Sequence, residues 1–195
     1  IPANLVRSDD ETEEIIHIKA GESVDKSVDV VFTGRDNALH VDQLKIKLED
    51  NASVPVIERH DGEGAYWKNR VTDIDLGQNA RLNHIRIQQD SHTAVNTNMV
   101  HMRVARDAVY NSFNLNIGGK LTRHEIHAEI HGENAEISFN GVNLLNGDQH
   151  GDTTIVIEHQ APHCRSNQFY RSLLDDNACC VFQGKVHVHQ AAQKT

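Results

Sequence analysis

The feature that most constrains this chain is a short turn that recurs along the sequence. In five copies of this turn an Asn or Asp is followed directly by Ala, and these alanines are Ala52, Ala80, Ala108, Ala135 and Ala178. The intervals between them are 28, 28, 27 and 43 residues. Near-equal spacing of this size is typical of stacked structural repeats. Asn and Asp suit the turns because both tolerate a left-handed backbone conformation and hydrogen-bond nearby main-chain groups.

The segments between the turns have the alternation of β-strands. Leu82, Tyr110, Ile137 and Cys180 each lie two residues after one of the alanines, and apolar alternation recurs over 100–104 and 126–130. Each period therefore predicts two strands and two turns without a helix. Further along the first strand of each pair, apolar residues occupy positions that the alternation assigns to polar residues. Ile85, Phe113 and Leu144 are among them. If these residues point inward, the alternation slips by one residue, which predicts a bulge or bend.

Two strands in each period of about 28 residues predict an all-β fold, a two-sided β-solenoid of parallel strands. The interval of 43 residues fits one and a half coils, with strands over about 153–159, 166–174 and 178–187. A β-sandwich or jelly roll is the alternative, but its strands recur roughly every 8 to 12 residues, without a second and longer period. Residues 1–195 are therefore expected to form a single domain.

Composition excludes several classes of protein. The net charge is −9 with the 14 histidines neutral, whereas sequence-independent binding to nucleic acid needs a basic surface. The longest apolar run, 178–182, is far too short to cross a membrane. The three cysteines, two of them adjacent, make a poor disulfide framework and indicate a reducing cytoplasm. We therefore expect a cytoplasmic protein with no nucleic-acid or membrane partner.

The histidines and cysteines raise the question of a metal site. His163 and Cys164 are weak candidate ligands, because their spacing matches no established metal-binding signature. His187 and His189 have a spacing that can chelate, but Val186 and Val188 would then point inward, which leaves both histidines on a solvated face. The sequence thus predicts no tight metal site, no cofactor and no catalysis in the isolated chain.

Other chemistry finds little support. Glycine turns such as 118–120 lack the spacing of a phosphate-binding loop, and neither a nucleophile elbow nor an H-E-x-x-H motif is present. Asp73 and Asp75 share one strand face and could serve a polysaccharide-cleaving β-helix enzyme. A carbohydrate-active β-helix protein and a His-rich metal-binding β protein remain the alternatives.

The last third of the chain resembles a known family. The segments 150–152, 162–171 and 181–185, together with His159, occur in order and are similar to the core of SufD-type members of the SufB/SufD family of SUF iron–sulfur cluster assembly proteins. This resemblance implies a right-handed parallel β-helix. It also implies a non-enzymatic scaffold that pairs with SufB and the SufC ATPase and supports cluster assembly or iron delivery, with a nascent cluster only in the full complex. The end of the chain, 192–195, is similar to the stretch where members leave the β-helix, so we expect a fragment lacking N- and C-terminal helical regions.

The strand over 178–189 is expected to be the last coil before the end of the chain. Such an edge offers main-chain hydrogen bonds to another strand. The candidate interface residues are Cys179, Val181, Gln183, Lys185 and His187, whereas Cys180 and Phe182 are expected in the core. The resemblance implies that SufB covers this edge, and a homodimer through the same edge is expected without SufB.

Overall fold

The protein consists almost entirely of parallel β-strands. The computed structural model describes residues 6–7 and 12–193. One sheet contains β1 (Val6–Arg7), β2 (Thr12–Ile18), β4 (Ala38–Leu48), β6 (Trp67–Leu76), β8 (Val95–Val104), β10 (Leu121–Ile130), β12 (His150–His159) and β14 (Cys179–Val188). The other contains β3 (Val28–Gly34), β5 (Ser53–Gly62), β7 (Arg81–Gln88), β9 (Val109–Asn116), β11 (Glu136–Leu145) and β13 (Arg165–Leu174). A 3₁₀ helix, η1 (Gln190–Ala192), follows β14.

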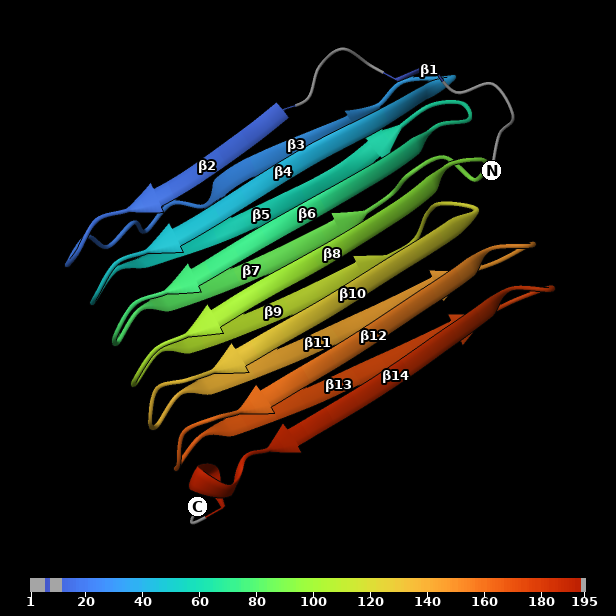
Figure 1. The fold of residues 1–195 in the computed structure, drawn as a ribbon. Coiled ribbons are helices and arrows are strands. Elements are labelled where there is room, and N and C mark those ends of the chain that lie inside the picture. Colours follow the sequence, from blue (N-terminus) through green and yellow to red (C-terminus); the bar gives the residue numbers. More distant parts are fainter. Residues whose placement is uncertain (1–5, 8–11, 194–195) are drawn as a thin grey trace.

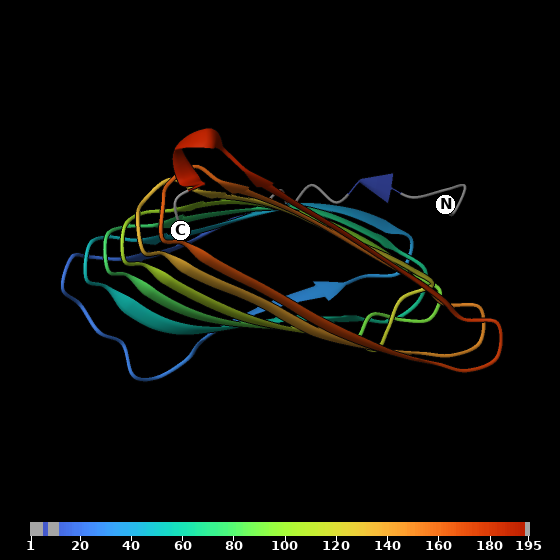
Figure 2. The same cartoon turned by 90° about the horizontal axis from the view of Figure 1, so that it is seen from below.

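Successive strands alternate between the two sheets, so the chain winds as a flattened solenoid. In Figure 1 the sheet that contains β4 and β14 lies in front, and its strands run toward the lower left, while the strands of the other sheet run the opposite way behind it. Because the chain also descends from blue to red, the coil is right-handed. Figure 2 looks along the stack and shows the two sheets lying face to face within a flat outline. The predicted right-handed parallel β-helix is confirmed. No helix among the described residues is long and apolar enough to span a membrane.

The register between coils follows the period that the sequence predicts. Leu48 pairs with Leu76, and Leu76 pairs with Val104, so each partner lies one period further along the chain. These three side chains are buried and form a column through the core. A repeat of this length stacks similar residues on one another, because each coil places the same inward position directly over that of the previous coil. The aliphatic layers of the core therefore follow directly from the sequence repeat.

The predicted corner of alanines is present. Ala52, Ala80, Ala108 and Ala135 are all fully buried. The residues that precede them adopt left-handed conformations, with φ of 59° at Asn51, 55° at Asn79, 58° at Asp107 and 58° at Asn134. Consecutive corners are joined by main-chain bonds of 2.9 Å, such as Arg81 N–H to the Ala52 carbonyl. The stacking prediction is thus confirmed.

The interval of 43 residues also has the predicted origin. Three strands, β11, β12 and β13, lie between Ala135 and Ala178, so that Ala178 falls at the opposite corner. There the Cys179 N–H donates to the Gln149 carbonyl at 2.9 Å. One detail differs from the expectation, since the left-handed residue is Asp176, with φ of 54°, rather than Asn177.

The predicted slip of alternation in mid-strand is wrong. Along β7 every second residue stays buried, so Ile85 is 39% exposed while His84 and Arg86 point into the solenoid. Phe113 and Leu144 are exposed in the same way on β9 and β11. The reason is that β7 pairs residue by residue with β5 and β9, and a bulge would break that ladder. Polar side chains therefore enter the interior.

Candidate functional site

The C-terminal coil presents an unpaired strand. β14 pairs with β12 along its whole length, and no other described strand pairs with it. The five predicted interface residues alternate along β14 on its outer face, and all are exposed except Val181, which is half-buried. They are Cys179, Val181, Gln183, Lys185 and His187. Their role in binding a partner stays a prediction.

The inward-facing side of this last coil is apolar and uncovered. Phe182 was expected in the core, but it is 45% exposed, and Val186 and Val188 are exposed to a similar degree. Cys180 is only half-buried. These side chains do face inward, but no later coil among the described residues stacks on them. Phe182 instead packs against Tyr170 of β13, with ring centroids 4.9 Å apart. The end of the solenoid therefore displays apolar surface of the kind that proteins cover with a cap or partner.

His163 and Cys164 continue the corner that the alanines form. His163 is exposed and takes the left-handed position, with φ of 62°. Cys164 follows it in the place of the stacked alanine, and the Arg165 N–H bonds to the Ala135 carbonyl at 2.9 Å. The Cys164 thiol lies 3.1 Å from the Gly132 carbonyl, and burial raises the pKa of this thiol. Both residues thus have a structural place in the turn, and their role as metal ligands stays a prediction.

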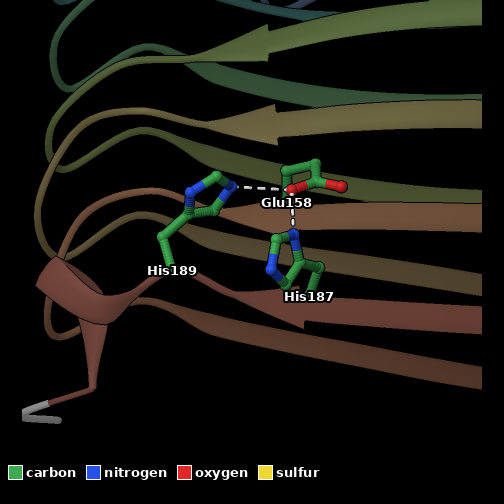
Figure 3. A group of neighbouring side chains, drawn as sticks. All are labelled: Glu158, His187 and His189. Atoms are coloured by element: carbon green, nitrogen blue, oxygen red, sulfur yellow. Dashed lines mark hydrogen bonds and ion pairs between the residues drawn. The ribbon is translucent and has the colours of Figure 1, made fainter.

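A different group of side chains converges at the end of β12 and β14. Figure 3 shows His187 and His189 pointing toward the carboxylate of Glu158. The Nδ1 atom of His187 and the Nε2 atom of His189 each lie 2.7 Å from Glu158 Oε2. The two imidazole centroids are 4.5 Å apart. One ligand atom from each residue lies within 4.8 Å of the others, and no other such group of three His, Cys, Asp or Glu residues occurs in the described part of the chain.

Strand pairing explains why these three residues meet. Glu158 and His187 are partners in the parallel register of β12 and β14. His189 lies two residues further, which returns its side chain to the same face. Its N–H donates to the His159 carbonyl at 2.9 Å and so extends the ladder just beyond β14. Hydrogen bonds from His189 and His187 lower the pKa of Glu158, so the carboxylate is ionised at neutral pH.

A second polar cluster fills the interior of the N-terminal coils. Its centre is Glu58, which is fully buried on the inner face of β5. His60 Nε2 lies 2.5 Å and Arg70 Nη1 lies 3.0 Å from Glu58 Oε1, while His84 Nε2 lies 3.1 Å from Oε2. The guanidinium of Arg86 approaches the same carboxylate at 3.8 Å. A single buried acid is therefore surrounded by two guanidinium groups and two imidazoles.

The surroundings set the protonation of this cluster. Burial alone would favour the neutral carboxyl, but hydrogen bonds from His60 and His84 and the charge of Arg70 hold the pKa of Glu58 well below its ordinary value. Burial, reinforced by the charges of Arg86 and Arg70, lowers the pKa of His60 to about 3. At neutral pH the cluster therefore holds an ionised Glu58, a neutral His60 and two charged arginines.

Further buried polar groups extend this network toward the corner of the solenoid that lies opposite the stacked alanines. Lys68 Nζ and the Tyr66 hydroxyl donate to Asp90 Oδ1 at 2.7 and 2.8 Å. Burial would raise the pKa of Asp90, but the charge of Lys68 outweighs it and lowers that pKa to about 2. Asn96 bridges the two groups, since it donates to Asp90 Oδ2 at 2.7 Å and accepts from Arg86 at 3.2 Å.

This interior has little space for a ligand. The cavity beside Glu58, His84 and Arg86 has a volume of about 20 Å³, which is room for about one water molecule. The polar side chains of the interior therefore bind mainly one another. Their arrangement supports a structural role, in which a buried ionic network fixes how neighbouring coils stack.

Comparison with known proteins settles the family. Residues 30–195 match the family described as "SUF system FeS cluster assembly, SufBD core domain". The chain belongs to the SufBD family. The resemblance found in the sequence is thus confirmed at the level of the family.

Three relatives illustrate the extent of the SufBD likeness. An iron–sulfur cluster assembly SufBD family protein of Synechocystis is 32% identical over 163 residues, which is 78% of this chain and 36% of that protein. The chloroplastic protein ABCI7 of Arabidopsis thaliana is 26% identical over 77% of this chain and 32% of its own length. The iron–sulfur cluster assembly protein SufD of Escherichia coli is 26% identical over 77% of this chain and 36% of its own length. The chain thus spans about a third of each of these relatives.

Two features of this SufBD core were not predicted from the sequence. The buried polar cluster was missed because Ile85 and Phe113 were assigned to the core, although strict alternation from Leu82 points to His84 and Arg86 instead. Glu158 was missed as a partner of His187, although the two residues are one coil apart. For the buried cluster the usable signal is the strict alternation along each strand, whereas the partner of His187 follows only from the strand register in the folded chain.

Proposed function

We propose that this chain is the β-helix core of a SufD-type subunit of the SUF iron–sulfur cluster assembly complex. In this role it pairs with SufB and, together with the SufC ATPase, supports cluster assembly or the delivery of iron. It is a cytoplasmic scaffold without catalysis of its own, and a nascent cluster is held only in the full complex. Membership of the SufBD family and the likeness to a protein named SufD support the proposal.

The observation that carries the pairing with SufB is the unpaired edge of β14. The N–H groups of Cys179 and His189, near the two ends of the strand, donate to the Gln149 and His159 carbonyls at 2.9 Å. Main-chain groups of alternate residues point to opposite sides of a strand. The N–H groups of Gly184 and Val186 therefore point away from β12, where a strand of SufB can accept from them. The exposed side chains of Phe182 and Val186 add apolar area beside this edge.

Co-purification tests this proposal. A tagged form of the chain is expressed with SufB and SufC of the same organism, and we expect SufB to be retained. Val186→Pro removes one N–H on the unpaired side of β14 and should weaken binding to SufB about fivefold, since a lost hydrogen bond costs on the order of 1 kcal/mol. Glu136→Gln, which changes an exposed side chain on β11 away from this edge, is the control. Failure to retain SufB, or undiminished binding by the proline variant, would contradict the proposal.

The same edge accounts for the expected homodimer. Without SufB, two copies of the chain can pair through β14, so sedimentation should show dimers at high concentration and mainly monomers when the chain is diluted. The Val186→Pro variant should stay monomeric at concentrations where the wild type dimerises. Contact with SufC is part of the same proposal and rests on family membership alone.

The carbohydrate-active alternative gains no support from the acids that suggested it. Arg103 forms two hydrogen bonds with the Asp75 carboxylate, at 2.6 and 2.8 Å, and Gln43 donates to Asp73 at 2.9 Å. Paired glycosidase carboxylates have to be available to the scissile bond. Asp73 and Asp75 are instead engaged in contacts that stabilise the outer face of the sheet.

A further inference from the structure

We propose that Glu158, His187 and His189 form a binding site for a divalent transition-metal ion, with two imidazoles and one carboxylate as ligands. All three ligands come from this chain, so the inference does not depend on pairing with SufB. It departs from the expectation that the isolated chain holds no metal tightly. It also places the ligands away from His163 and Cys164, the pair that the sequence suggested.

Convergence on a single oxygen is the first argument. Nδ1 of His187 and Nε2 of His189 both lie 2.7 Å from Glu158 Oε2, so one carboxylate oxygen faces two imidazole nitrogens. Ring centroids only 4.5 Å apart bring the two imidazoles to the same side of this oxygen. Neutral imidazole and ionised carboxylate are the forms that bind a metal ion, and here one carboxylate and two imidazoles converge.

The ligand distances are compatible with coordination. Zinc bonds to imidazole nitrogen and carboxylate oxygen measure about 2.0 to 2.2 Å, which places neighbouring ligand atoms roughly 3 Å apart. The nitrogen–oxygen distances of 2.7 Å need to open by only a few tenths of an ångström. The imidazoles are about half exposed and the Glu158 carboxylate is about a quarter exposed, so their side chains can make this adjustment.

Local charge favours a cation at this position. Glu129 of β10 is the register partner of Glu158 on the side away from β14, so a second acid lies on the next strand. Lys185, two residues before His187, is the nearest base on the same face of β14. The charges of Glu129 and Lys185 oppose each other, so the carboxylate of Glu158 supplies the negative charge that favours a cation.

The donor set selects the class of ion. Imidazole with carboxylate suits Zn²⁺ and Fe²⁺, whereas Mg²⁺ and Ca²⁺ prefer oxygen ligands alone. Two histidines and one carboxylate leave coordination positions open, which water fills in the isolated chain. Because the two imidazoles are about half exposed, these open positions are accessible from solvent. We therefore assign Fe²⁺ or Zn²⁺ to the site.

Titration of the metal-free chain tests the assignment. After treatment with a chelator, the chain is dialysed against Zn²⁺, against Fe²⁺ without oxygen, and against Mg²⁺. We expect one equivalent of Zn²⁺ or Fe²⁺ and no stoichiometric Mg²⁺. Co²⁺ serves as a spectroscopic probe, because its visible absorption should report nitrogen and oxygen ligands. His187→Ala, His189→Ala and Glu158→Gln should each weaken binding at least about tenfold.

A matched control separates this site from the other surface histidines. His127 lies on the outer face of the same sheet and contacts Glu125 at 3.2 Å, but no third ligand completes the group. His127→Ala should therefore leave the stoichiometry and the affinity unchanged. Thermal unfolding confirms that each variant is folded before it is titrated. Absence of a bound equivalent in the wild type, or an equivalent retained by the His187 and His189 variants, would overturn the proposal.

Discussion

The Nδ1 atom of His187 lies 2.7 Å from Oε2 of Glu158, although 29 residues separate them in the sequence. The contact exists because one turn of the solenoid returns the chain to the same place one strand further along. The same relationship places Asn79 above Asn51, where the Asn79 amide donates to the Asn51 side-chain oxygen at 2.9 Å. Neighbours in this molecule are thus residues about one coil apart, and the predictions below use that relationship.

The left-handed corner predicts a specific order of stability among variants. Asn79 has φ of 55°, a left-handed conformation that Asn tolerates but that costs most other residues with a Cβ roughly 1 to 2 kcal/mol. Asn79→Ala should therefore lower the free energy of unfolding by about that amount. It also removes the hydrogen bond to Asn51. Asn79→Gly, which tolerates this backbone, should lose less. Urea unfolding measures both, and equal losses would show that the corner conformation does not matter.

Strict alternation along β7 predicts opposite outcomes for two nearby apolar residues. Leu82 is 1% exposed and Ile85 is 39% exposed. Leu82→Ala should destabilise the protein by about 2 to 5 kcal/mol, because it leaves a cavity in the core. Ile85→Ala should cost less than about 1 kcal/mol. If the Ile85 variant proved the more damaging one in thermal unfolding, the inward assignment of His84 and Arg86 would be wrong.

Removal of the central buried charge should be costly. Glu58→Gln keeps the shape of the side chain but leaves Arg86 without its acid and Arg70 with Asp42 alone, and breaking a buried ion pair costs about 3 to 5 kcal/mol. Glu136→Gln is the matched control, since Glu136 pairs with Arg165 at the surface, where such pairs contribute little. Denaturant titration of both variants measures the difference. A Glu58 variant as stable as its control would contradict the assigned network.

The buried imidazole of His60 predicts a loss of stability in acid. Its pKa is lowered to about 3, whereas an unfolded histidine takes up a proton near its ordinary value of 6.5. Between these values the unfolded state binds more protons, so the free energy of unfolding falls as the pH is lowered. Each such group contributes a slope of about 1.4 kcal/mol per pH unit.

Asp90 adds to the acid sensitivity at lower pH. Its pKa is lowered from 3.8 to about 2, so the stability it contributes above pH 3.8 is lost as the pH falls toward 2. Urea unfolding from pH 7 to pH 3 measures the combined dependence. His60→Asn should reduce its slope between pH 6 and pH 4, and the same change at the exposed His131 should not. A stability that stays constant over this range would contradict a neutral, buried His60.

Much of the fold could be predicted because the repeat and the turn chemistry are local features of the sequence. The spacing of Ala52, Ala80 and Ala108 fixes both the period and the corner, and the C-terminal segments indicate the family. The interior could not be predicted as easily. Apolar residues are favoured inside on average, but His84 and Arg86 are buried because their polar groups bind to other polar side chains, Glu58 and Asn114 among them, on neighbouring strands.

The Glu158 group escaped prediction for a different reason. The separation of register partners is 26 for Asn98 and His124 but 29 for Glu158 and His187, because the turns differ in length. An average period therefore does not identify which residue of β12 lies beside His187. The pairing follows only from the strand register in the folded chain.

Hydrogen exchange in the presence of SufB tests the central claim, that this SufBD core pairs through its last coil, most directly. The amide protons of Gly184 and Val186 point away from β12, so they should exchange quickly in the isolated chain. We predict that they become strongly protected when SufB is added, while the amides of β7 are unaffected. A stable complex with SufB in which the amides of β14 exchange as fast as in the isolated chain would contradict the account.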